Sequence, residues 1–228
     1  MDDANKTKKE IFQSVIISYW EQKGRHDLPW RKTDDPWQLL VAEILLRKTT
    51  SEQAVEVFGV LSKYTPREIL NVEGSFLEDI LRPIGIYKVR AEQLKSAALF
   101  FDSNANIRTL SDEELRSLKG VGRYISNMVR CITSGAAVPA LDSNMIRVLT
   151  RYFGYISNRK RAREDQNFWK FAETLVPIGY CKEFNWGVLD FGADICTFYK
   201  PKCLHCPLSG YCSYFQNINN SCGAIIDE

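Results

Sequence analysis

Residues 115–135, LRSLKGVGRYISNMVRCITSG, decide the fold that we predict for this chain. A short helix is expected to end at Leu118, and a turn that contains two glycines follows at 119–123. After the turn, apolar residues recur at the spacing of one face of a second helix. This face is made by Ile125, Met128, Val129 and Ile132. The stretch therefore predicts two helices joined by a tight turn.

The two glycines of the turn, Gly120 and Gly122, carry the chemical information. Because glycine has no side chain, backbone N–H groups at the start of the second helix can approach an anion closely. The positive end of the helix dipole favours a phosphate at that place. A Gly-Val-Gly turn by itself is more often an ordinary turn, and this alternative stays open. Its position between two helices favours a hairpin that holds a DNA backbone phosphate.

Helical periodicity extends along nearly the whole chain, beginning with an apolar stripe that ends at Gly24. The strict alternation of a half-buried strand is missing from the sequence. Further helix starts are predicted at Asp35, which precedes a proline, and at capping boxes that open with Thr65, Ser75 and Ser111. We therefore expect an all-α protein without an internal repeat.

The chain has 228 residues, of which 45% are hydrophobic, enough to bury a core in one domain or in two packed lobes. The net charge is only +2, so a nucleic-acid surface would have to come from local patches. One such patch is the run Arg159, Lys160, Arg161 and Arg163, although a basic run is usually a solvated face. Because no apolar run approaches the roughly 18 residues of a membrane span, we expect no membrane partner.

Four cysteines lie close together in the pattern C-x6-C-x2-C-x5-C, namely Cys196, Cys203, Cys206 and Cys212. Four neighbouring thiolates suit a [4Fe-4S] cube, whereas structural zinc usually uses two tight pairs separated by a longer loop. Disulfides are a third interpretation, but the other cysteines are scattered and the N-terminus lacks a signal peptide. The pattern favours an iron-sulfur cluster in a reducing, cytoplasmic compartment.

Two acidic residues are distinguished by their positions. Glu43 is the single carboxylate in the apolar stretch 39–46, so we expect it to be partly buried. Burial raises the pKa of a carboxyl group and can make a glutamate a general acid near neutral pH. Pairing with Arg31 or Arg47 is the structural alternative. Asp142 precedes a new amphipathic helix, where an aspartate is most often only an N-cap.

Taken together and in this order, these features resemble one known family. From about Asp27 to Cys212, the chain is similar to the helix-hairpin-helix superfamily of DNA glycosylases. It is most similar to the iron-sulfur branch, which contains endonuclease III, the MutY adenine glycosylases and the thymine-DNA mismatch glycosylases. Besides the cysteines, the motifs that carry the resemblance are DLPWRKTDDPW at 27–37, AEILLRKTT at 42–50, PIGIYKVRAEQL at 83–94, LKGVGRYIS at 118–126 and LDSNMIRVL at 141–149.

The resemblance implies a two-lobed fold. A six-helix barrel lobe would span 27–138 and contain the helix-hairpin-helix at about 112–134. Residues 1–26 and 139–228 would form a second helical lobe, in which the loop 196–212 holds the [4Fe-4S] cluster.

The resemblance also implies roles for individual residues. Asp142 corresponds to the catalytic carboxylate, and Glu43 would act on the departing base. Tyr124 and Asn144 would orient Asp142 and the sugar. Tyr124 occupies the position where bifunctional relatives carry a Schiff-base lysine, and a phenol cannot replace that amine, so we expect a monofunctional enzyme. The residues expected to contact DNA are Arg31, Arg47, Lys48, Thr49, Ile86, Tyr87, Gly120, Val121, Gly122, Arg123, Ser143, Lys200 and Lys202.

The expected substrate is double-stranded DNA in which thymine or uracil is mispaired with guanine. Arg47 and Lys48 stand where MutY proteins have a glutamine pair, and only 16 residues follow Cys212, where MutY proteins usually continue into a further domain. The alternatives are a MutY-like glycosylase acting on adenine opposite guanine or 8-oxoguanine, and a non-catalytic iron-sulfur module for DNA binding or redox sensing. We expect a monomer in the cytoplasm, associated with the nucleoid.

Overall fold

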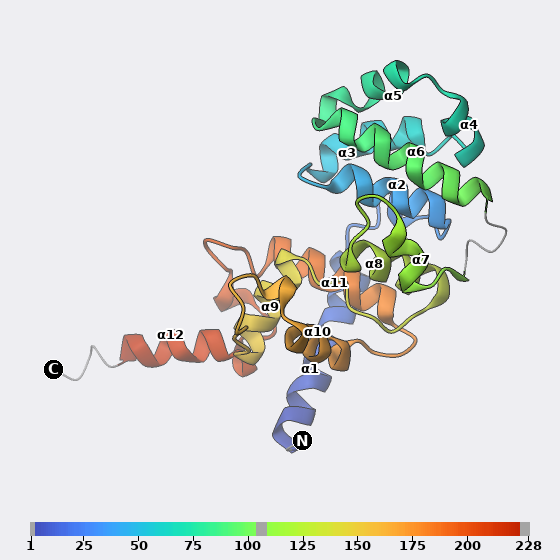
Figure 1. The fold of residues 1–228 in the computed structure, drawn as a ribbon. Helices are drawn as coiled ribbons and strands as arrows, with labels where there is room; N and C mark the ends of the chain where they lie inside the picture. Colours follow the sequence, from blue (N-terminus) through green and yellow to red (C-terminus); the bar gives the residue numbers. More distant parts are fainter. Residues whose placement is uncertain (1–2, 104–108, 224–228) are drawn as a thin grey trace. The chain divides into compact units, whose positions relative to one another are not determined.

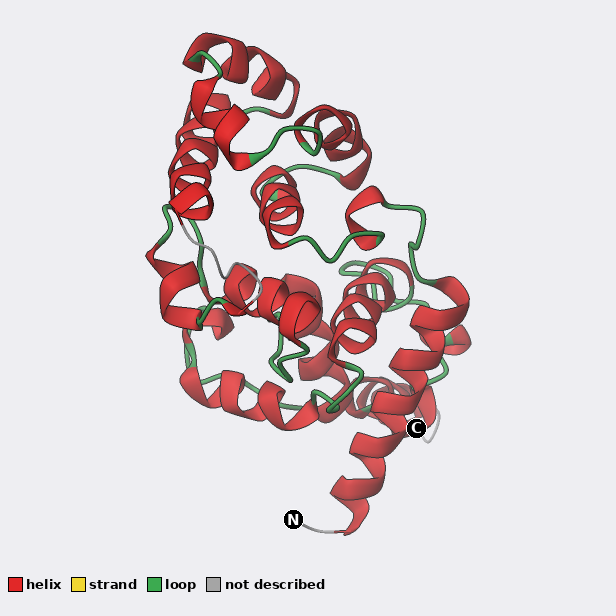
Figure 2. Cartoon of the chain, turned by 90° about the vertical axis from the view of Figure 1, so that its right-hand side faces the viewer, coloured by secondary structure: helices red, strands yellow, loops and turns green. Residues whose placement is uncertain are grey.

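The structure is a computed structural model that describes residues 3–103 and 109–223. Throughout these residues, every regular element is an α-helix or a short 3-10 helix, and no strand is present (Figure 2). The prediction of an all-α protein is therefore confirmed. Among the described helices, none is both long enough and apolar enough to cross a membrane.

The chain divides into two compact units, one formed by residues 1–24 and 137–228 and the other by residues 25–136. The boundaries expected from the sequence lie between residues 26 and 27 and between residues 138 and 139. The units are called here the split unit and the central unit, and each is described separately.

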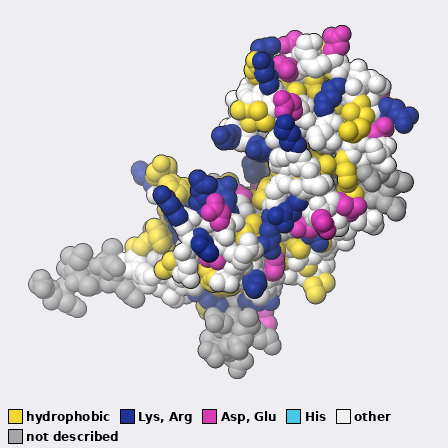
Figure 3. Space-filling view, in the orientation of Figure 1, with side chains coloured by type: hydrophobic (Ala, Val, Ile, Leu, Met, Phe, Trp, Pro, Cys, Tyr) yellow, Lys and Arg dark blue, Asp and Glu magenta, His cyan; other side chains and the backbone are white. Residues whose placement is uncertain are grey.

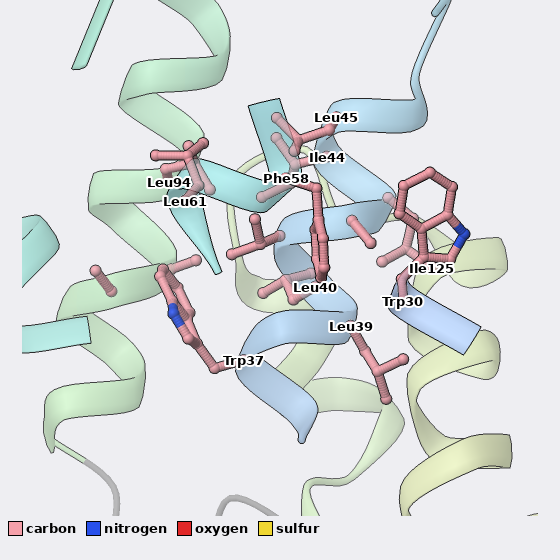
Figure 4. Packing of buried hydrophobic residues seen from close by; sticks show 14 of the residues in the cluster. Trp30, Trp37, Leu39, Leu40, Ile44, Leu45, Phe58, Leu61, Leu94 and Ile125 are labelled. Atoms are coloured by element: carbon pink, nitrogen blue, oxygen red, sulfur yellow. The ribbon is translucent and has the colours of Figure 1, made fainter. Parts of the chain in front are cut away.

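The central unit is built around α2 (Pro36–Leu46), which packs against α3 (Ser51–Leu61), α6 (Tyr87–Ser103) and α8 (Arg123–Ser134). Figure 4 shows Leu40 and Ile44 of α2 among apolar side chains from these helices. The described residues of this unit also contain α4 (Pro66–Asn71), α5 (Gly74–Leu81) and α7 (Asp112–Ser117). The described part of this unit thus contains seven α-helices, two of which are the short helices between Thr65 and Leu81.

Three of the four helix starts that we singled out are confirmed. Asp35 caps α2 by accepting a hydrogen bond from the Trp37 N–H, and Thr65 and Ser111 open complete capping boxes. The capping box at Ser75 is wrong, because α5 already begins at Gly74 and Ser75 lies inside it. The residue before the helix, Glu73, forms no side-chain cap.

In the split unit, the first helix of the chain packs against α11 (Cys181–Asp194), which lies near the other end of the sequence. The helices of this unit are α1 (Asp3–Lys23), α9 (Ser143–Phe153), α10 (Gln166–Leu175), α11 and α12 (Ser213–Gly223), labelled in Figure 1. A Cβ atom added to Gly187 of α11 would lie 2.7 Å from the Ile16 carbonyl oxygen of α1, so glycine allows the two helices to approach closely. The Phe12 ring packs against Tyr152 and Phe184 at centroid distances of 5.1 and 5.9 Å, which joins α1, α9 and α11 in one core.

Candidate functional site

The predicted hairpin is present in the central unit as α7, a turn at 118–122 and α8. Gly120 has φ +85°, and an added Cβ would lie 2.1 Å from the Gln93 Nε2 atom and 3.0 Å from the Arg47 guanidinium. Only glycine therefore fits there without displacing these groups. Val121 is buried below the turn, and Gly122 is the N-cap of α8 and forms no side-chain cap. The first turn of α8 thus begins without a side-chain acceptor, as an anion site requires.

Two other turns of the central unit are joined by the fully buried Arg90 side chain of α6. Its guanidinium donates hydrogen bonds to the carbonyl oxygens of Ile84 and Gly85, at 2.7 Å for Gly85. It also donates to the carbonyl oxygens of Leu45 and Arg47, at 3.2 Å for Leu45, and to the Thr49 hydroxyl at 2.5 Å. One side chain thus holds the turn after α2 and the turn before α6.

Both turns place a non-glycine residue in the left-handed region of backbone conformation. Lys48 has φ 55° and Ile86 has φ 41°. Both side chains are exposed, and Ile86 exposes 45% of its surface although it is apolar. Backbone strain of this kind costs of order 1–3 kcal/mol and is concentrated at functional sites. The structure therefore presents two of the residues that we expected to contact DNA on strained, fixed turns.

The remaining predicted residues of the central unit lie on its helices. Glu43 is partly buried in the middle of α2, as expected, between Ala42 and Ile44, which are fully buried. Tyr124 lies in the first turn of α8, beside Arg123, and packs partly against the apolar core. Arg31 ends a 3-10 helix (Pro29–Arg31) and is partly buried.

In the split unit, Asp142 is the N-cap of α9. Its Oδ1 atom accepts a hydrogen bond from the Met145 N–H at 2.7 Å. Asn144 follows in the first turn, and its Oδ1 atom accepts from the Arg147 guanidinium at 2.8 Å. Arg147 also donates to the carbonyl oxygens of Gly192 at 2.6 Å and Cys196 at 2.8 Å. The position of Asn144 is thereby fixed by α11 and by the segment that follows it.

The charge of Asp142 is influenced by two opposing effects. Burial raises the pKa of the Asp142 carboxyl group above its ordinary value. Backbone hydrogen bonds from Met145 and Asn144, the positive charge of Arg147 and the Asn144 side chain lower that pKa, but burial is the larger effect. Burial thus distinguishes Asp142 from a solvated N-cap, whose ionisation carries no such cost.

The four predicted metal ligands lie in the segment of the split unit that connects α11 and α12. Arg151 of α9 donates to the Cys196 sulfur at 3.5 Å, and its carbonyl oxygen contacts the Cys212 sulfur at 3.5 Å. Burial, together with the charges of Cys212, Cys196 and Cys203, raises the pKa of Cys206 to about 11. Cys196 and Cys212 thus both contact one residue of α9. Among the described residues, however, no group of three or more candidate ligands is arranged to hold a metal ion.

The lysines of the cysteine loop differ from each other. Lys202 forms an ion pair with Asp194, at 2.6 Å between Nζ and Oδ1. Lys200 is exposed. Of the two, Lys200 is the one that the loop presents to solvent without an observed ion pair, so it is the better candidate for a phosphate contact.

Sequence reasoning missed Arg90 and Arg147, which hold the candidate residues in place. The signal for Arg90 was a cation next to Ala91, at a position where the helical pattern places the buried face of α6. The signal for Arg147 was weaker, because a charged residue in the second turn of an amphipathic helix is usually solvated.

Comparison with known proteins identifies the family. The sequence pattern of the HhH-GPD superfamily, described as base excision DNA repair proteins, matches residues 41–174. The thymine/uracil-DNA glycosylase of Pyrobaculum aerophilum is 40% identical over 211 residues, covering 90% of this chain and 92% of that protein. The thymine-DNA glycosylase of Aeropyrum pernix is 39% identical over 218 residues, covering 93% and 98%.

A solved structure of a thermostable thymine-DNA glycosylase superposes with a TM-score of 0.86 at 37% identity, covering 94% of this chain and 100% of that one. The chain therefore belongs to the HhH-GPD superfamily of base excision DNA repair proteins.

Proposed function

We propose that this member of the HhH-GPD superfamily is a monofunctional DNA glycosylase that removes thymine or uracil mispaired with guanine from double-stranded DNA. The observation that carries the proposal is the partly buried Asp142 at the start of α9, with a raised pKa and an organised set of hydrogen-bond donors. The two relatives named as thymine or thymine/uracil glycosylases, each similar over at least nine-tenths of this chain, support the choice of base.

Asp142 would stabilise the deoxyribose as its bond to the base breaks. The sugar gains positive charge in that transition state, and an ionised carboxylate beside it lowers the barrier. Because the Met145 N–H and Arg147 favour the ionised form, the carboxylate can carry its charge in spite of burial. Asn144, held by Arg147 at 2.8 Å, would keep the carboxylate in one orientation.

Glu43 would act on the departing base. A carboxyl group flanked by buried residues of an apolar helix can hydrogen-bond a pyrimidine or transfer a proton to it, directly or through water. Loss of the base as a protonated or hydrogen-bonded species is easier than loss of the free anion. Glu43 and Asp142 are thereby assigned separate tasks, one on the base and the other on the sugar.

The absence of an amine at position 124 determines the product. A lysine there would attack the sugar carbon and lead to strand cleavage, but Tyr124 carries a phenol, whose ordinary pKa is about 10. Water therefore completes the reaction and leaves an abasic site in an intact strand. Replacing Tyr124 with lysine should introduce a borohydride-trappable enzyme–DNA complex, and a folded Tyr124→Lys variant that excises base without such a complex would contradict this assignment.

The DNA would be held by the hairpin and opened by the two strained turns. The start of α8 at Gly122 can bind a backbone phosphate, and Ile86 and the Arg47–Lys48 turn can fill the space left by the extruded base. A mispaired thymine costs less to unpair than a matched one, which adds to selectivity. Cationic side chains at 47 and 48 suit the oxygen and nitrogen acceptors of the unpaired guanine.

We further propose that Cys196, Cys203, Cys206 and Cys212 hold a [4Fe-4S] cluster. Their donor set suits this cluster, and the sulfur atoms of Cys196 and Cys212 both contact Arg151 of α9. The cluster would crosslink the loop 196–212 and fix Lys200 for a phosphate contact. Iron and sulfide analysis of anaerobically purified protein should give four of each per chain, whereas one zinc per chain would contradict the proposal.

The deciding experiment measures base release from labelled duplexes that contain a single G·T, G·U, A·T, A·G or A·8-oxoguanine pair. We expect alkali-dependent nicks with G·T and G·U and none with A·T. Nicks at A·G or A·8-oxoguanine would instead indicate an adenine glycosylase, and binding without nicks would indicate a non-catalytic module. Nicks that appear without alkali would contradict the monofunctional mechanism. The same proposal places a monomeric enzyme in the cytoplasm, where its DNA substrate is.

A further inference from the structure

A hollow of about 760 Å³ opens beside α9 in the split unit. Its wall is made by Ser143, Ile146, Arg147, Thr150, Arg151, Arg161, Ala162, Arg163 and Phe198. Four of these residues are arginines and none is acidic. Figure 3 shows Lys and Arg side chains gathered on the face that carries α9. A concave surface of one charge concentrates the electric field and selects an anion.

The arginines of the hollow form two different sets. Arg147 and Arg151 belong to α9 and donate to backbone carbonyl oxygens of residues 192–198, so their positions are fixed while their charges remain. Arg161 precedes the short 3-10 helix Ala162–Glu164 and Arg163 lies within it, and both arginines are exposed. Arg161 forms an exposed ion pair with Glu164 at 3.4 Å, a contact of little energy that an anion can replace. Arginines held by backbone carbonyls and exposed arginines thus line the same concave wall.

We propose that this hollow binds a phosphodiester of the DNA strand that carries the target nucleotide, a contact separate from the hairpin. Ser143 lines the hollow and directly follows Asp142, so the hollow begins one residue from the carboxylate assigned to the sugar. A strand that places its deoxyribose at Asp142 would bring its neighbouring phosphates near Ser143 and the arginines of the hollow. The inference rests on the proposed function, because it uses the role given there to Asp142.

The neighbouring residues Arg159 and Lys160 provide a matched control. They belong to the same basic run and are exposed, but they do not line the hollow. The test compares Arg161→Ala/Arg163→Ala with Arg159→Ala/Lys160→Ala, since each pair removes two positive charges. The dissociation constant for a G·T duplex is measured over a range of salt concentrations, with a thermal denaturation curve for each variant.

We expect the hollow pair to weaken binding by at least about tenfold and to reduce the salt slope by about one per lost phosphate contact. The control pair should change affinity less than about threefold, and Arg163→Lys should retain most of the binding. The proposal is overturned if the two pairs lose affinity equally, because charge alone would then matter, or if neither loses affinity. Base release by the unmodified chain is measured in a separate assay. A failure of the proposed function would appear there, whereas a failure of the present inference would appear only in the dissociation constants.

A second inference is carried by Arg90. We infer that Arg90 is a positioning residue for base extrusion, because its side chain contacts both turns that carry Lys48 and Ile86 in the left-handed conformation. Without its guanidinium, five hydrogen bonds to these turns are lost and the strained backbones can relax. The exposed side chains would then no longer hold the geometry needed to fill an opened base stack. This inference, too, rests on the proposed function.

Lys95 is the matched control for Arg90, since it is a cation on the same helix with the same kind of structural task. Its ammonium group donates to the carbonyl oxygens of Leu70 at 2.9 Å and of Val72, at the end of α4. Arg90→Met and Lys95→Met therefore both leave backbone carbonyls without a donor, but only Arg90→Met affects the two strained turns.

Base extrusion is followed by the fluorescence of 2-aminopurine placed next to the mispaired thymine, and excision by single-turnover rates at saturating enzyme. We expect both variants to lower Tm. Only Arg90→Met should reduce the fluorescence rise and lower the rate by about tenfold or more, with affinity for matched duplex nearly unchanged. Arg90→Lys should recover part of the rate, and a uracil in an unpaired bulge should be removed almost normally.

Rates that fall in proportion to Tm in both variants would make Arg90 a purely structural residue and overturn the inference. An equal defect on the bulged uracil would overturn it too, because extrusion is then not the impaired step. If the unmodified chain released no base at all, the proposed function would fail and the fluorescence comparison would still report on Arg90.

Discussion

Two helices of the split unit begin with an aspartate as N-cap, and the pKa values of these two aspartates are shifted in opposite directions. Asp142 caps α9 by accepting from the Met145 N–H at 2.7 Å, and Asp165 caps α10 by accepting from the Asn167 N–H at 2.9 Å. In the sequence each precedes an amphipathic helix, and each has the local form of an ordinary N-cap.

Their pKa values move in opposite directions. A hydrogen bond from the Ser157 hydroxyl at 2.8 Å is the main cause that lowers the pKa of Asp165, and backbone N–H groups assist it. For Asp142, burial outweighs the donors and raises the pKa. The surroundings of Asp165 therefore stabilise its ionised form, whereas the surroundings of Asp142 disfavour its ionised form. A carboxyl group with a raised pKa is a candidate for a chemical role, which is the role proposed for Asp142.

The largest effect that tests this comparison is on catalysis. Asp142→Asn preserves the size and the capping ability of the side chain but removes the negative charge beside the sugar. We expect the single-turnover rate on a G·T duplex to fall by about 10³-fold, as for other preorganised electrostatic groups, with little change in binding. Asp165→Asn should retain a rate within about twofold of the unmodified chain.

Comparable rate losses in the two variants would remove the distinction between catalytic and capping aspartates. Binding must be measured alongside, because a variant that no longer binds DNA gives no information on the chemical step. Gel-shift titration with the same duplex supplies that control.

The pH dependence of the rate should also distinguish the two aspartates, with an effect smaller than the rate loss predicted for Asp142→Asn. Only ionised Asp142 can stabilise the sugar, so the rate should fall as pH drops through the raised pKa, by about tenfold per pH unit below it. This acid limb should lie above the ordinary range of aspartate, which is near 3.9. Asp165→Asn should keep the limb, while the residual rate of Asp142→Asn should lack it. A limb that survives in Asp142→Asn belongs to another group, with Glu43 the first candidate.

Glu43 extends the comparison to a carboxylate with no capping role. It lies inside α2, so Glu43→Gln leaves helix ends unchanged and tests its action on the base alone. We expect a loss of about 10- to 100-fold for thymine, in the range of general acid catalysis, and a smaller loss for uracil, the better leaving group. Single-turnover rates on G·T and G·U duplexes measure both. Equal and negligible losses would return Glu43 to a structural role.

The sequence was informative where a few neighbouring residues determine the structure. The hairpin at Gly120 and the caps at Asp35, Thr65 and Ser111 depend on backbone geometry within four residues, and all were predictable. Ser75 failed for a local reason as well, since the helix starts two residues earlier than its serine-to-glutamate pattern suggests.

Long-range contacts explain what could not be predicted. Arg90 binds acceptors that precede it by 41 to 45 residues, so no local pattern marks it as the link between two turns. The same limit applies to Asp142 and Asp165. The sequence marks Asp142 as a helix cap and does not single out Asp165, and their opposite pKa shifts come from burial and from the Ser157 hydroxyl, which a cap motif does not encode.

The smallest predicted effect concerns stability, and its sign differs between the two aspartates. Burial gives Asp142 a higher pKa in the folded than in the unfolded chain, so its ionisation costs stability as pH rises between those two values. Asp165 has the lower pKa when folded, so it contributes stability above the ordinary aspartate pKa and loses it as pH falls through the lowered one. At pH 7, Asp142→Asn should leave Tm unchanged or raise it, whereas Asp165→Asn should lower it by about 2–4 °C. Thermal denaturation at pH 7 and at progressively lower pH measures both signs, and the Asp165→Asn deficit should shrink in acid. A loss of Tm in Asp142→Asn as large as that in Asp165→Asn would mean that the α9 carboxylate is stabilised like an ordinary cap.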